Sequence, residues 1–170
     1  MNLTRRSSRP LNAAAERSVR AMKIIRDKRL EEFKRIEHLL YGINYEVWFN
    51  LFGPCDSDAS LESAIRKLIS NDCEVSGVAP SSPKDAEIEI MDMVLYEGDT
   101  GSGPIELEKK KEEIIKLMGN VFSKIRLKDA DIVSEFGFRN GHPAYPVFWD
   151  FAFDIHSNGE RWIFIGCSSD

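Results

Sequence analysis

The chain of 170 residues has 28 acidic and 23 basic side chains, a net charge of −5, and a hydrophobic content of 42%. This is typical of one globular domain with an apolar core. It argues against a membrane partner, because no apolar run approaches the roughly 20 residues that cross a bilayer. Cys55, Cys73 and Cys167 are too few and too widely spaced for a disulfide framework, so we expect reduced thiols and a cytoplasmic location.

Charge is divided unevenly along the chain. Residues 1–40 hold 11 basic and five acidic side chains, and residues 41–170 hold 12 basic and 23 acidic ones, which gives net charges of +6 and −11. Nine of the 17 aromatic residues fall within 129–170. A basic arm on an acidic body with an aromatic sheet is more typical of a binding surface than of an active site.

The N-terminal region predicts a tail followed by a long helix. Residues 1–11 are expected to be a disordered tail, and 12–170 a single α+β domain. Two arginines interrupt the apolar stripe of the helix, so we interpret 12–30 as a helical arm that either projects from the body or packs on it. Residues 31–52 are expected to be the packed part of this helix.

Three more helices are predicted, at 59–70, 83–97 and 104–126, with a loop at 71–82. The first has an apolar face at helical spacing, and Asp58 is positioned to cap it. The segment 83–97 also alternates as a strand does. A proline at its first position and acids in its first turns favour the helix.

The last forty residues change to a period of two. Alternation predicts strands at 132–138, 147–156 and 162–167, and Asn158-Gly159 predicts a two-residue hairpin turn because both positions of that turn need positive φ. The expected fold class is α+β, with a mostly helical N-terminal two-thirds packed on a C-terminal antiparallel β-meander of about three strands.

The polar face of the predicted strand at 147–156 carries the strongest candidate for chemistry. Asp150, Asp154 and His156 share this face, where residues two apart lie about 6.6 Å from each other. Asp154 and His156 match an acid/base or metal-ligand pair, with His142 as a third member. The alternative is the solvent-facing side of an amphipathic strand. Because no cofactor motif or dense ligand cluster accompanies these residues, we assign no catalytic residue, metal or cofactor.

The loop before this strand has features of a recognition element. Tyr145 lies between Pro143 and Pro146, whose rings fix φ and stiffen the loop. A tyrosine on a rigid loop loses little entropy on docking. We therefore group the residues that fit partner binding as Asp150, Asp154, His156, His142 and Tyr145, with a plain strand connection as the alternative for the loop.

The expected function is a non-enzymatic protein-binding module, most specifically an immunity-type inhibitor that binds and neutralises a cognate bacterial toxin. An acidic surface steers basic partners and suits a basic toxin domain. One alternative is a small hydrolase or metal-dependent enzyme that uses Asp150, Asp154 and His156. A further alternative is a nucleic-acid-associated protein that uses the basic N-terminal helix, although interleaved acids disfavour nucleic acid. The same helix is a candidate homodimer contact.

Overall fold

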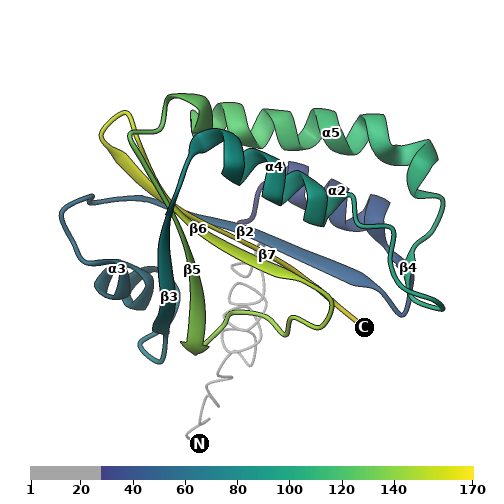
Figure 1. Ribbon diagram of the computed structural model, residues 1–170, viewed down its shortest axis with the longest axis horizontal. Coiled ribbons are helices and arrows are strands. Elements are labelled where there is room, and N and C mark those ends of the chain that lie inside the picture. Colours follow the sequence, from purple (N-terminus) through teal and green to yellow (C-terminus); the bar gives the residue numbers. More distant parts are fainter. Residues whose placement is uncertain (1–27) are drawn as a thin grey trace, which may run out of the picture.

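The computed structural model describes residues 28–170, which form an antiparallel sheet with helices on both faces (Figure 1). The helices are α2 (Glu31–Leu40), α3 (Leu61–Leu68), α4 (Pro83–Val94) and α5 (Leu107–Lys124), and a 3₁₀ turn, η1 (Leu127–Asp129), follows α5. The strands are β1 (Gly42–Ile43), β2 (Glu46–Cys55), β3 (Glu74–Ser81), β4 (Gly103–Pro104), β5 (Ile132–Asn140), β6 (Asp150–Ser157) and β7 (Glu160–Ser169). The predicted tail at 1–11 and nearly all of the predicted arm at 12–30 lie outside the described residues.

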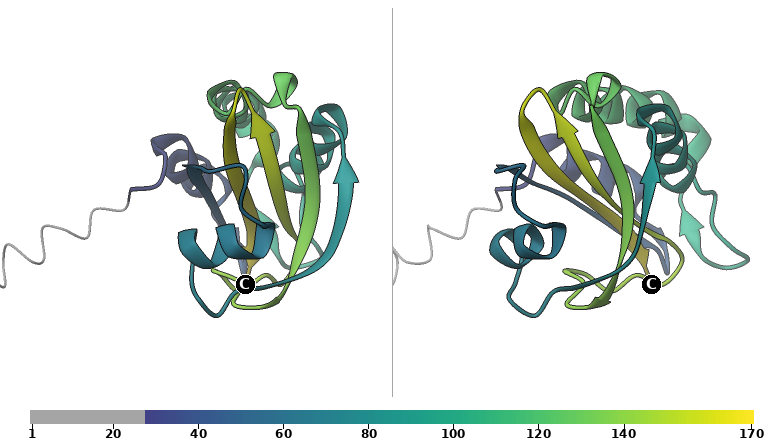
Figure 2. Two further views of the ribbon diagram at one scale, coloured as in Figure 1. Left: turned by 90° about the vertical axis from the view of Figure 1, so that its left-hand side faces the viewer. Right: turned by 60° about the vertical axis from the view of Figure 1, so that its left-hand side comes forward.

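The main sheet has five strands in the order β2-β7-β6-β5-β3, and every neighbouring pair is antiparallel. Helices α2, α4 and α5 cover one face, and the shorter α3 lies on the other (Figure 2). Strands β1 and β4 pair separately. The predicted α+β class is confirmed. The predicted arrangement is wrong, because β2 and β3 come from the first half of the chain and form both edges of the sheet.

The long helix predicted through residue 52 ends at Leu40. Beyond it, Asn44 has a positive φ of 45°, and the chain turns into β2. Val47 and Phe49 point into the core under α2, whereas Trp48 and Phe52 pack on the opposite face. Since both faces of β2 are covered, its apolar residues do not alternate with polar ones, and the period of two is hidden.

The segment predicted as a loop at 71–82 contains the edge strand β3. Gly77 has a positive φ of 59°, and the register with β5 shifts between Ser76 and Ala79, which marks a bulge. The strand is exposed from Gly77 to Pro80. Glycine, proline and exposure together remove the usual strand signal, and an edge position tolerates all three.

The remaining predicted elements are confirmed with shifted ends. Helix α4 begins at Pro83, and the Ser82 hydroxyl accepts a hydrogen bond of 3.1 Å from the Asp85 amide. Helix α3 is capped by Ser60 rather than by the predicted Asp58. The β6–β7 hairpin turns at Asn158 and Gly159, whose φ values of 53° and 76° are those that the turn requires.

Two apolar clusters hold the sheet between its helices. The larger one joins α2, α4 and α5 to the face of β6 that carries Phe151, Phe153 and Ile155. The smaller one places Ile65 of α3 against Ala152 and neighbouring strand residues. The polar face expected to be open to solvent is therefore largely covered.

Within residues 28–170, no helix combines the length and apolarity needed to cross a bilayer.

Both edges of the sheet are closed to a further strand at specific groups. On β2, the Phe49 amide donates to Glu37 Oε1 at 3.0 Å, and the Phe49 carbonyl accepts from Arg29 at 3.3 Å. On β3, the bulge and Pro80, which has no amide hydrogen, interrupt the row of donors. These features disfavour the pairing of a further strand at these groups.

Candidate functional site

The five predicted partner-binding residues fall into two groups at opposite ends of β6. Asp150 begins the strand, and the loop before it carries His142 and Tyr145. Asp154 and His156 lie near the end of β6, beside the hairpin turn. Asp150 and Asp154 are four residues apart, or about 13 Å along a strand. The structure therefore brings Asp154 and His156 together and separates Asp150 from them.

Asp154 forms a buried ion pair with Arg161 of β7. Arg161 Nε and Nη2 each donate to one carboxylate oxygen at 2.8 Å. Asp154 is 6% exposed, and Arg161 is 3% exposed. The hydrogen bonds with Asp154 are the main cause of the raised pKa of Arg161, which burial alone would lower. His156 Nε2 lies 3.2 Å from Asp154 Oδ1.

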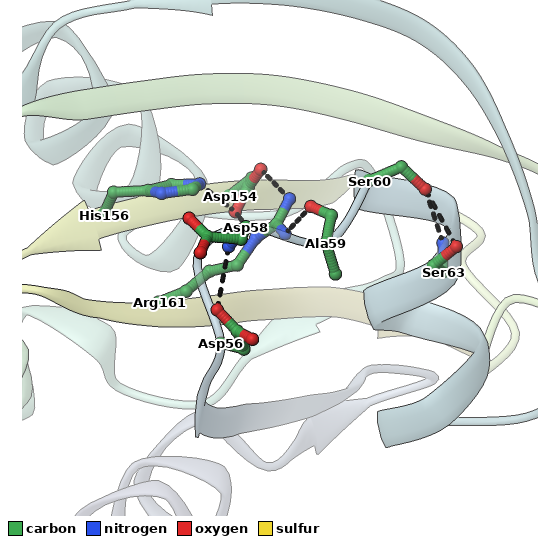
Figure 3. Close-up of polar contacts among 8 residues, drawn as sticks. All are labelled: Asp56, Asp58, Ala59, Ser60, Ser63, Asp154, His156 and Arg161. Atoms are coloured by element: carbon green, nitrogen blue, oxygen red, sulfur yellow. Dashed lines mark hydrogen bonds and ion pairs between the residues drawn. The ribbon is translucent and has the colours of Figure 1, made fainter.

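The same arginine attaches the chain before α3 to the sheet. Arg161 Nη1 donates to the Ala59 carbonyl at 2.6 Å, as Figure 3 shows, so one guanidinium joins β6, β7 and the segment leading into α3. The Asp56 side chain accepts from the Asp58 amide at 2.9 Å within this segment. Ser60 then starts α3. The cluster positions α3 over the smaller apolar cluster.

This arrangement leaves Asp154 little capacity for chemistry. A general base needs an open position beside a reacting proton, but both oxygens of Asp154 accept from Arg161. Within residues 28–170, no three His, Cys, Asp or Glu side chains come together in a geometry suited to a metal ion. The geometry is that of a structural ion pair, whose loss would leave a buried charge without a partner.

Arg161 was missed at the sequence level, although a signal for it exists. The turn at Asn158-Gly159 pairs His156 with Arg161 and places Asp154 diagonally across on the same face. Side chains so placed are within reach of each other when they are long. The predicted turn therefore places Arg161 within reach of Asp154.

The other group belongs to the loop at 141–149. His142 Nδ1 lies 3.0 Å from the Ala144 amide nitrogen, and its ring meets the edge of Phe138 with 4.9 Å between centroids. Burial lowers the pKa of His142, and the hydrogen bond with the Ala144 backbone and the Asp150 carboxylate, 3.9 Å from Nε2, only partly offset this effect. His142 therefore supports the loop from inside, where burial favours its neutral form.

The C-terminal half of this loop is fixed by its main chain. The amides of Val147 and Phe148 donate to the Ser168 carbonyl, and the Ser168 amide donates to the Trp149 carbonyl. The Trp149 indole donates to the Tyr45 hydroxyl at 2.9 Å, and burial is the main cause of the raised pKa of Tyr45. The loop is thereby held against β7 and the start of β2.

One side chain of this loop projects almost fully into solvent. Tyr145 is 89% exposed, and Val147 is 56% exposed. Three exposed acids stand near the same end of β7: Asp150 pairs with Cys167, Glu46 pairs with Ser169, and Asp170 follows it. We call these five residues, Tyr145, Val147, Asp150, Glu46 and Asp170, the Tyr145 surface.

Comparisons of the chain with protein-family models, with curated proteins and with solved structures give no match. The interpretation of the Tyr145 surface and of the Asp154 cluster therefore rests on their geometry and charge.

Proposed function

We propose that the protein is a non-enzymatic binding module that recognises another protein through the Tyr145 surface. The observation that carries the proposal is Tyr145 itself, an aromatic side chain almost fully in solvent on a loop whose main chain is bonded to β7. Exposed tyrosines on ordered loops give large contact areas at a small entropic cost, and tyrosine is enriched among residues that dominate binding energy.

The charge of the body supports a basic partner. Residues 28–170 hold 16 basic and 26 acidic side chains, a net charge of −10. The exposed acids of the Tyr145 surface add to this negative potential near one end of β7. Such a field raises the association rate with a basic protein and orients it before contact.

The specific form of the proposal is an immunity-type inhibitor, which binds a basic toxin domain of bacterial origin and blocks its action in the cytoplasm. The three cysteines are unpaired, in accord with a reducing compartment. This function needs only a rigid complementary surface and no catalytic group, and the Tyr145 surface has that character.

The enzyme alternative draws less support, because Arg161 occupies both oxygens of Asp154 and β6 separates Asp150 from His156. The nucleic-acid alternative rests mainly on residues before 28, outside the described residues. Among the described basic residues of the predicted N-terminal helix, Arg29, Lys34 and Arg35 are ion-paired with Glu37, Glu31 and Glu113. The homodimer contact proposed for the same helix also falls largely outside the described residues.

The experiment is a growth-rescue assay with basic toxin domains encoded beside the gene for this chain. Cells that express one such domain are expected to grow when the protein is co-expressed, and the purified pair is expected to bind more weakly as salt rises. Glu112→Gln is the control variant. It removes one exposed acid from α5, away from the Tyr145 surface, and is expected to rescue growth as the wild type does. Failure to rescue growth from any of these domains, with no binding of the purified proteins, contradicts the immunity function.

A further inference from the structure

A cavity of about 540 Å³, open to solvent and lined mostly by exposed side chains, lies between α4 and the C-terminal half of α5. Its lining includes three cationic side chains, Lys116, Arg126 and Lys128, together with the carboxylates of Glu87 and Asp129. This volume falls in the range of small-molecule sites. The cavity is far from the Tyr145 surface: the Ser157 hydroxyl, at the end of β6, bonds to the Arg126 carbonyl, whereas the Tyr145 loop meets the start of β6.

The charge of the cavity is opposite to that of the body. Three cations face two acids here, although residues 28–170 as a whole have a net charge of −10. Arg126 is 3.6 Å from Asp129, and neither Lys116 nor Lys128 takes part in an ion pair with a described residue. Arg126 and Lys128 follow the C-terminal end of α5, where cations offset the helix dipole. Lys116 lies two turns inside the helix, so the dipole does not account for it.

Gly119 is the second unusual feature of the cavity. It lies in the interior of α5, and a Cβ added to it would meet no atom within 4 Å. Glycine inside a helix is unfavourable because it loses more backbone entropy than alanine on folding. No packing within residues 28–170 requires a glycine at this position. Because Gly119 has no side chain, a ligand in the cavity could approach the backbone of α5 closely.

We infer that the cavity binds a small phosphorylated sugar. Lys116, Arg126 and Lys128 would hold the phosphate, since cationic donors form short, charge-assisted hydrogen bonds with phosphate oxygens. Asn120 and Ser123 supply neutral hydrogen-bonding groups from the same helix. Glu87 and Asp129 would accept hydrogen bonds from sugar hydroxyls, which explains why carboxylates share a cationic cavity.

The test is a titration of the full chain with ribose 5-phosphate, ribose and inorganic phosphate, followed by calorimetry and by amide NMR shifts. We expect saturable binding of ribose 5-phosphate that perturbs the α5 amides, with weaker binding of inorganic phosphate and none of ribose. The double variant Lys116→Gln/Lys128→Gln is expected to weaken ribose 5-phosphate binding about tenfold or more. The control Lys109→Gln/Lys111→Gln removes the same charge from the part of α5 outside the cavity and is expected to leave the affinity unchanged.

Gly119→Ala separates a binding role from a structural one. The variant is expected to fold with unchanged or higher thermal stability and to bind ribose 5-phosphate more weakly. Absence of saturable binding below about 10 mM overturns the proposal. Equal losses in the two double variants would show non-specific attraction and overturn it as well. Inorganic phosphate binding as tightly as ribose 5-phosphate would overturn the assignment of a sugar.

Discussion

Replacing Asp154 by Asn separates a structural role for this residue from a catalytic one. The side chains of Asp and Asn have nearly the same shape, so the variant removes the charge and little volume. It also places an amide group where the carboxylate accepts two hydrogen bonds of 2.8 Å from Arg161. Arg161, which is 3% exposed, would then be a buried cation without its counter-ion.

The expected loss follows from the burial of the pair. Removing one partner of a buried ion pair costs about 3–5 kcal/mol, because the remaining charge is left uncompensated. Asp150→Asn is the matched control on the same strand. Its side chain is 48% exposed, and its contact with His142 is 3.9 Å, so the expected loss is below about 1 kcal/mol.

The assay is urea unfolding followed by far-UV circular dichroism, with the free energy of unfolding extrapolated to water. A double variant, Asp154→Asn/Arg161→Leu, removes both charges and is expected to lose less stability than Asp154→Asn alone. If Asp154→Asn unfolds with the same free energy as the wild type, the ion pair does not hold α3 to the sheet, and a catalytic role for Asp154 regains support.

Three further predictions test the core, the loop and the thiols. Gly166→Ala should cost about 1–3 kcal/mol or more, because its new Cβ would meet the Phe151 and Phe49 rings at 2.5 and 2.7 Å. By contrast, Gly119→Ala should gain about 0.5–1 kcal/mol, and equal melting temperatures for the two variants would refute the packing argument. Because burial lowers the pKa of His142, the unfolded chain takes up its proton first, and stability should fall as pH drops below about 6.5. His142→Phe should lose part of this pH dependence in urea unfolding between about pH 7.5 and 5.5, and identical profiles would show that His142 does not contribute. Burial raises the pKa of Cys167 to about 12, and Cys73 is also buried, whereas Cys55 is half-buried. A thiol reagent should therefore label Cys55 first in the native protein, as mass spectrometry can show, and equal labelling of all three would contradict the structure.

The sequence was most informative where local chemistry decides the structure. The Asn158-Gly159 turn specifies its own backbone conformation, and Ser82-Pro83 starts α4 in the predicted manner. The strands of the β6–β7 hairpin were located by alternation of large apolar residues. These elements depend on neighbours within a few residues along the chain.

The sheet edges could not be predicted, because tertiary contacts decide them. Strand β2 is covered on both faces, and Val47 lies four residues after Ile43, so it fits the helical spacing of the preceding segment as well as a strand. Strand β3 lies exposed at the other edge, with Gly77 and Pro80 in its path. Neither segment shows an alternation of polar and apolar residues, and the partner strands that stabilise them are far away in sequence.

The candidate site was only partly visible for the same reason. Tyr145 and Asp150 were identified from the stiff loop and the strand pattern, and both lie on the surface. The burial of Asp154 depends on α3, which the sequence did not place over this face. The cavity beside Gly119 involves α4, α5 and η1, and no pattern within one of these elements indicates it.

The central claim, recognition through the Tyr145 surface, is tested most directly by the affinity of Tyr145→Ala for the toxin domain whose toxicity the wild type relieves. Truncating a dominant interface tyrosine costs about 2 kcal/mol or more, so the dissociation constant should rise about 30-fold, with an unchanged melting temperature. Ile115→Ala, which truncates an exposed residue of α5, should bind as the wild type does. A Tyr145→Ala variant that binds with wild-type affinity would contradict the assignment of this surface.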